Sequence, residues 1–279
     1  MASTNKCIRV PLSPENRVAG TRKHLQIALQ YAIVPLTLLL LWEAAVRFGW
    51  VPNSLIASPS QVAIRLMKML GNLSLEKNAL VSLKRLSVGF ALGTATGIAA
   101  GVLVGASRIG ARMLEPTILT LLPIPPIAWI PLLIILFGIG DASKIALISL
   151  GSFCTLFFST TYGIRTADRN LVELAQVLDK DRRILVLEIL LPGAIPNILS
   201  SMRVALALSW TLLICSEVIA SSSGLGWLIW DARNFSRADD MIVGMIAVGI
   251  LGKASDWLLD LLERRLTRWR VAYRELQNG

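Results

Sequence analysis

The chain has 279 residues, of which 54% are hydrophobic and only 16% charged, and its mean hydropathy is +0.63. A soluble domain of this length would not be so apolar, so the composition predicts a membrane protein. The formal net charge of +10 would suggest nucleic-acid binding in a soluble protein. Here the basic residues lie between and beside apolar segments, which is typical of membrane orientation and gives no reason to expect a nucleic-acid partner.

The residues that usually carry catalysis are scarce. The chain has one histidine, His24, in a polar N-terminal arm, and three cysteines, Cys7, Cys154 and Cys215, which share no metal-ligand spacing. Two of these cysteines lie in apolar runs, where thiols pack as small hydrophobic groups. We therefore expect no catalytic residue, no metal site and no cofactor bound by this chain, and we do not expect an enzyme.

The apolar runs predict an all-α polytopic membrane protein. A helix needs about 20 apolar residues to cross the hydrocarbon core. An N-terminal arm, 1–26, is basic, and the run that follows it has no convincing cleavage site, which predicts an uncleaved signal anchor. The six candidate spans are approximately 27–46, 79–106, 114–137, 145–162, 198–219 and 241–262.

The distribution of basic residues predicts that both termini are cytoplasmic. With that orientation, seventeen Lys and Arg fall on the cytoplasmic side and seven on the opposite side. The predicted regions are the arm 1–26, the first span with an external interfacial helix at 27–78, a permease core at 79–262 and a basic tail at 263–279.

The external helix is expected to begin at Ser58 and Pro59, because proline is favoured in the first turn of a helix. One face of it is apolar and the opposite face carries Arg65 and Lys68, which indicates an interfacial position. The same pattern fits an amphipathic cover of the bundle as well as it fits a docking site for a partner.

The second span carries a glycine on every fourth residue, so these glycines share one helix face and let another backbone approach closely. They are Gly89, Gly93, Gly97, Gly101 and Gly105. We favour packing against a helix of the same chain over packing against a second copy.

The third span is interrupted by prolines, which remove backbone donors and must bend or break the helix at membrane depth. The run LLPIPPIAWIP contains Pro123, Pro125, Pro126, Trp129 and Pro131. Two hypotheses stay open: the break lines a substrate path, as in other transporters, or it only shapes packing.

Few ionisable residues lie inside the spans, and such residues are functional candidates by default. Glu217 lies near the end of the fifth span, fourteen residues from Arg203, which is too far to pair with it along one helix. We expect Glu217 to be a structural or gating group of the path. Lys253 and Asp256, three residues apart, are expected to neutralise each other.

A polar loop, 166–196, is predicted to form a helix, a turn and a second helix in the cytoplasm. Asn170 and Glu173 have the spacing of a capping box, and an apolar stripe follows on one face. The stripe consists of Leu171, Leu174, Ala175 and Leu178. A turn is expected at 179–181, and the second helix is expected to end near Pro192.

At this loop the chain resembles the permeases of binding-protein-dependent ABC importers, whose signature is E-A-A, three residues, G, nine residues, I-x-L-P. The matching positions are Glu173, Leu174, Ala175, Asp179, Ile189, Leu190, Leu191 and Pro192. Leu174 replaces an alanine and Asp179 replaces the glycine, which puts the turn geometry in question because aspartate enters a left-handed turn at some cost. Two further stretches, LLPIPPIAWIPLLIILFGIGDASKIALI and SSSGLGWLIWDARNF, are similar to the nitrate, sulfonate, taurine and bicarbonate importer group.

The resemblance implies a homodimer of permeases in the bacterial inner membrane, two cytoplasmic ABC ATPase subunits and a periplasmic or lipid-anchored binding protein. It implies that the loop helix, with Glu173, Leu174, Ala175, Leu178 and Asp179, docks on the ATPase. ATP and magnesium would be bound by that partner, since the chain has no G-x-x-x-x-G-K-[ST] loop. The alternative is that the loop helix packs on the helix bundle of its own chain.

The resulting hypothesis is an ATP-driven importer of a small anion, with an aliphatic sulfonate or taurine as the first choice. Nitrate, bicarbonate, cyanate or an uncharged pyrimidine precursor are the other substrates considered. An ion-coupled secondary transporter is the main alternative, but it would need coupling charges at the midplane and an inverted repeat. A channel or scaffold subunit would have no use for the loop motif.

Overall fold

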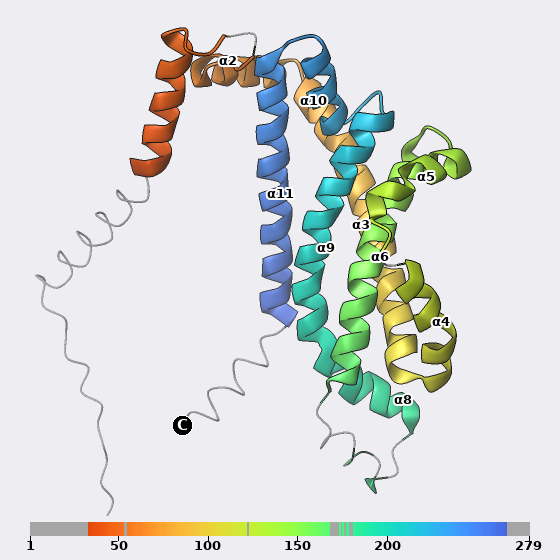
Figure 1. Cartoon of the computed structure of the whole chain (residues 1–279). Helices are drawn as coiled ribbons and strands as arrows, with labels where there is room; N and C mark the ends of the chain where they lie inside the picture. Colours follow the sequence, from red (N-terminus) through yellow and green to blue (C-terminus); the bar gives the residue numbers. More distant parts are fainter. Residues whose placement is uncertain are drawn as a thin grey trace, which may run out of the picture. The chain divides into compact units, whose positions relative to one another are not determined.

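A computed structural model of the chain describes residues 33–52, 55–121, 123–167, 173, 175, 177–178 and 181–266. All regular elements within these residues are helices, which confirms the all-α fold class (Figure 1). Contacts divide the chain into two compact units, Met1–Ala63 and Ile64–Gly279.

In the first unit, residues 33–47 are helical, and α2 (Pro59–Gly71) begins at the proline, as the sequence predicts. A capping box starts α2: the backbone N–H of Ser58 donates to Oε1 of Gln61 at 3.0 Å, and the N–H of Gln61 donates to Oγ of Ser58 at 3.3 Å. The Glu43 carboxylate accepts bonds from the backbone N–H and the hydroxyl of Ser60, at 3.1 and 2.9 Å. These bonds tie the helix of residues 33–47 to the first turn of α2.

The second unit contains the long helices. Within the described residues, four helices are long and apolar enough to cross a membrane, or five if a bent pair counts as one span. The pair is α4 with the segment Pro126–Phe137, and its two parts meet at 88°. The elements are α3 (Ser74–Ala106), α4 (Arg108–Leu121), η1 (Pro126–Trp129), α5 (Ile130–Phe137), α6 (Asp141–Arg165), α8 (Arg182–Ile184), η2 (Leu185–Leu190), α9 (Leu191–Ala220), α10 (Leu225–Asn234) and α11 (Ala238–Leu266).

The number of spans therefore stays a prediction. The first candidate span, 27–46, is described only from residue 33 onward, and the basic arm 1–26 lies outside the described residues. At the other end, α11 runs to Leu266, beyond the predicted start of the tail at 263, and residues 267–279 are not described.

The core of the second unit is built on α6, which packs along α3 on one side and along α9 on another (Figure 1). Its side chains Leu147, Ile148, Leu156 and Phe157 are almost fully buried. The helices α3 and α9 are also apolar. Together with α6 they form one continuous packed layer at the centre of this unit.

The prediction that the loop's second helix ends near Pro192 is wrong. A π-helix, η2, leads directly into α9, so the backbone stays helical from Leu185 to Ala220. Pro192 falls in the first turn of α9, and the N–H of Leu191 bonds back to the Val186 carbonyl, five residues earlier. The wider π turn moves the preceding carbonyls away from the proline ring, and so this proline does not break the helix.

Candidate functional site

The glycine face of α3 contacts α6 of the same chain. A β-carbon built on Gly97 would lie 2.7 Å from the Phe153 carbonyl oxygen, and one built on Gly101 would lie 2.9 Å from that of Phe157. Gly93 likewise faces the Ser149 backbone, whereas the nearest atoms to Gly89 and Gly105 belong to the side chains of Ile148 and Ile164. In return, the hydroxyl of Ser149 donates to the Gly89 carbonyl at 2.9 Å. The two helices are therefore in backbone contact, with no space for side chains between them.

The predicted coupling segment is described at only some positions. Glu173, Val177 and Leu178 are exposed and Ala175 is buried, while Leu174 and Asp179 lie outside the described residues, as does Asn170. Val177 and Leu178 expose 83% and 59% of their surface. The described positions of the segment thus present two apolar side chains and one carboxylate on the surface.

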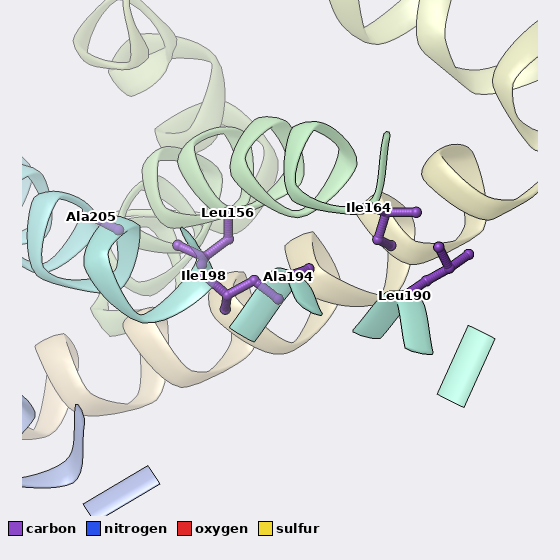
Figure 2. Packing of buried hydrophobic residues seen from close by; sticks show 6 residues of the cluster. All are labelled: Leu156, Ile164, Leu190, Ala194, Ile198 and Ala205. Atoms are coloured by element: carbon purple, nitrogen blue, oxygen red, sulfur yellow. The ribbon is translucent and has the colours of Figure 1, made fainter. Parts of the chain in front are cut away.

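The chain that follows this segment is anchored in the core. Figure 2 shows Leu190 of η2 beside Ile164 of α6 and Ala194 of α9. The full buried cluster comprises Leu156, Ile164, Leu190, Ala194, Ile198 and Ala205. Since the side chains come from η2, α6 and α9, the cluster packs the end of the loop against two long helices.

The proline run interrupts the helix, as the sequence predicts, and the bend is sharp. After α4, the chain passes Pro123 and Pro125 in extended or turn conformation and then forms the 3₁₀ turn η1 and the short helix α5. Trp129 is half-buried and packs against the buried cluster Ile130, Leu147 and Leu212. Much of α5 is exposed, and Ile135, Leu136 and Phe137 each expose more than half of their surface.

Glu217 is fully buried, and its partner is Arg85 of α3. Nη1 of Arg85 lies 2.9 Å from Oε1 of Glu217, and Nη2 lies 2.7 Å from the Asp141 carboxylate at the start of α6. The side chain of Arg85 is only 5% exposed. The guanidinium thus links α3, α6 and α9 in one ion network, in which the Arg85–Glu217 pair is buried and Asp141 is exposed.

Neighbouring polar groups complete this network. The Ser82 hydroxyl donates to both oxygens of Glu217, at 2.8 and 2.9 Å, and the Gly226 N–H donates to Oε2 at 2.8 Å. Arg85 also donates to the Ser223 carbonyl at 2.8 Å. These bonds fix the turn that joins α9 to α10.

Glu217 lies inside a span, as the sequence predicts, but the sequence pattern does not reveal its partner. Arg85 lies 132 positions earlier, on another helix, so no spacing along one helix identifies the pair. The sequence does contain one indication of such a pair. A buried carboxylate without a partner is energetically costly, so Glu217 requires an opposite charge from another span.

Two further ion clusters tie helices together. Lys253 and Asp256 pair at 3.0 Å, which confirms the expected i,i+3 contact, and Arg203 of α9 also reaches Asp256 at 3.1 Å. Arg65 of α2 pairs with Asp240 of α11, with Nη2 and Oδ2 2.9 Å apart. The Asp240 carboxylate, through this hydrogen bond, raises the pKa of Arg65 above its ordinary value.

Taken together, the long apolar helices, the broken span and the loop anchored in the core define a polytopic helical membrane permease. The chain belongs to the binding-protein-dependent transport system inner membrane components, whose family model matches residues 93–268. Members of this family are transport permeases, not enzymes. The chain is accordingly a multi-pass inner-membrane protein.

Relatives and solved structures agree with this assignment. The chain is 34% identical over 241 residues to SsuC of Bacillus subtilis, a permease named for aliphatic sulfonates transport, covering 86% of this chain and 87% of that protein. It is 36% identical over 240 residues to the protein of the same name from Escherichia coli, covering 86% and 91%. A chain of the MetNI methionine ABC transporter in an inward-facing conformation has the same fold, with a TM-score of 0.58 at 20% identity, covering 67% of this chain and 94% of that one.

Proposed function

We propose that this permease is the membrane-spanning subunit of an ATP-driven importer for a short aliphatic sulfonate such as taurine. The names of the two SsuC relatives support the substrate class. The observation that carries the ATP-driven mechanism is the loop that bears the importer signature spacing, because it both exposes a docking surface and is anchored in the core.

The ATPase partner docks on the coupling segment. The exposed side chains of Glu173, Val177 and Leu178 form its described surface, and Leu174 and Asp179 belong to the same segment by the signature spacing. ATP and magnesium are bound by the partner. Closure of the ATPase dimer displaces the segment, and the Leu190 cluster passes the displacement to α6 and α9.

The complete importer contains two copies of this permease, two ATPase subunits and a periplasmic or lipid-anchored binding protein that selects the solute. Both termini of the permease lie in the cytoplasm, in agreement with the excess of basic residues on that side. The solute path runs along the broken span, near Pro123, Pro125, Pro126 and Trp129, with Glu217 as a structural group beside it.

The experiment that tests this proposal purifies the tagged permease in mild detergent and identifies its stoichiometric partners by mass spectrometry. Glu173→Arg reverses a charge on the docking surface and should release the ATPase while leaving the permease inserted. Glu188→Arg is the matched control, since Glu188 is an exposed carboxylate of η2 in the same loop.

We expect the wild type and Glu188→Arg to retain the ATPase and Glu173→Arg to lose it. Uptake of radiolabelled taurine by proteoliposomes with the ATPase and the binding protein should follow the same order. Full uptake in the Glu173→Arg variant would contradict the coupling role, and a wild type without any ATPase partner would contradict the importer itself.

A further inference from the structure

Lys144 is a buried ammonium inside a membrane span, and the ion network described above does not use it. It lies in the first turn of α6, and only 3% of its surface is exposed. Its Nζ donates to the Gly140 carbonyl at 2.8 Å. In the described part of the chain no second acceptor lies within hydrogen-bonding distance and no carboxylate lies within 4.0 Å of it.

A buried ammonium has three N–H donors, and two of them are left without a protein acceptor here. Leaving such donors unsatisfied is costly inside a protein, and this predicts that a small polar species occupies the space beside them. Asp141 and Glu217 do not accept these bonds, because neither carboxylate lies within 4.0 Å of the ammonium, and both pair with Arg85 instead, at 2.7 and 2.9 Å.

The space beside Lys144 is a small cavity of about 10 Å³, which is enough for roughly one water molecule. It is lined by Ser143 and Lys144 of α6, Ser216 of α9, and apolar side chains that include Ile130 and Ile134 of α5. Both serine hydroxyls donate to backbone carbonyls, at 3.1 and 2.8 Å. Their oxygens can still accept, so the site suits a water molecule in this conformation.

The helix α5 covers one side of this cavity. It has eight residues and lies between two breaks in the helical backbone. The proline run precedes it, and Gly138, with a φ of +77°, follows it. Neither Gly138 nor Gly140 would bring a β-carbon within 4 Å of another atom, so the connection to α6 is loosely packed. Displacement of α5 would open the cavity and expose the ammonium.

We propose that Lys144 is an anion-binding residue of the translocation path, covered by α5 in this conformation and available to the substrate's sulfonate group when α5 moves away. The inference rests on the proposed function. Two sulfonate oxygens accept the two free N–H bonds of the ammonium.

The sulfonate should bind only weakly beside Lys144, because a solute must also be able to leave a translocation path. Arg85, Lys144, Asp141 and Glu217 sum to zero formal charge, so the anion is held by direct hydrogen bonds and not by a net positive field. Sites in a conduction path must let the solute leave as readily as it enters.

The test is uptake of radiolabelled taurine by the complete transporter in proteoliposomes, measured together with ATP hydrolysis. Lys144→Gln removes the charge but keeps a donor for the Gly140 carbonyl, Lys144→Met removes both, and Lys144→Arg keeps the charge. Lys84→Met is the matched control, since Lys84 is an exposed lysine on α3, beside Arg85 in the sequence.

We expect Lys144→Gln and Lys144→Met to lower uptake per ATP hydrolysed by about tenfold, the effect of losing a charge-assisted hydrogen bond. Lys144→Arg and Lys84→Met should stay near the wild type. A purely structural lysine would instead lower uptake and ATP hydrolysis together. If Lys144→Met does not fold, Lys144→Gln decides the result.

Wild-type uptake per ATP in the Lys144→Gln variant would overturn the role of Lys144 and leave the proposed function intact. Equal losses of uptake and ATP hydrolysis in that variant would also overturn it, by assigning the lysine to stability alone. A wild type that hydrolyses ATP but imports no sulfonate would contradict the proposed function itself, and the inference with it.

Discussion

The two faces of α6 are packed in opposite ways. Toward α3, a row of glycines lets the two helices approach closely, and a side chain added at Gly97 would collide with the Phe153 carbonyl. Toward α5, the contact consists of aliphatic side chains, with Ile130, Leu133 and Ile134 in the cluster of Leu147 and Leu212, and α5 is flanked by a proline run and by Gly138. The first contact allows no sliding, whereas the second can separate at the cost of a small apolar area.

We infer from this difference that the tightly packed helices form a rigid body and that α5 is a movable cover over the cavity beside Lys144. The α3 face is reinforced at one end by the Arg85 network, which also holds α9 and the turn into α10. Buried ion networks of this kind are costly to break once their partners are in place. We therefore expect α3, α6 and α9 to move as one body during transport, and α5 to move against them.

The largest effect is expected from Gly97→Leu, which would force α3 away from α6. Because the contact is with backbone, no rotamer change relieves it, and the cost should exceed about 3 kcal/mol. Folded protein should be nearly lost in fluorescence-detected size-exclusion chromatography. Gly249→Leu on α11 is the control, since a β-carbon there meets nothing within 4 Å and the yield should be unchanged.

A smaller loss is expected from breaking the ion network. Glu217→Leu leaves the buried Arg85 with Asp141 as its remaining carboxylate partner and should cost up to about 3 kcal/mol, observed as a lower thermal unfolding temperature in detergent. The double variant Glu217→Leu with Arg85→Met removes both charges and should be more stable than Glu217→Leu alone. A double variant that loses as much as the two single variants combined would show that the two groups do not interact.

The smallest effect is expected on the α5 side. Ile134→Ala removes part of a half-buried side chain at the edge of the Leu147 cluster and should cost less than about 2 kcal/mol. Its thermal unfolding temperature should lie well above that of Glu217→Leu. If the α5 variant were the less stable of the two, the contrast between the faces of α6 would be wrong.

Local patterns in the sequence predicted much of this architecture. The glycine spacing, the proline break, the start of α2 and the pair of Lys253 and Asp256 each depend on residues close together in the chain, and all are found where they were expected. The signature spacing in the loop is also local, and it indicated the family to which the chain belongs.

Other features depend on contacts that no local pattern encodes. Arg85 meets Glu217 only after three helices have packed, and α10 was not anticipated because its ten residues are too few to form a span. The helix through Pro192 was missed because a π turn accommodates a proline that would end an ordinary α-helix. The burial of Lys144 likewise follows from α5 folding back against α6.

The most direct test is a pair of spin-label distances measured in the complete transporter. In a cysteine-free background, one pair joins Ile135 of α5 to Tyr162 of α6, and the other joins Leu92 of α3 to Tyr162, all three being exposed positions. On ATP binding, the Ile135–Tyr162 distance should change and the Leu92–Tyr162 distance should not. A change in the α3–α6 pair, or none in the α5–α6 pair, would contradict the division into a rigid body and a moving cover.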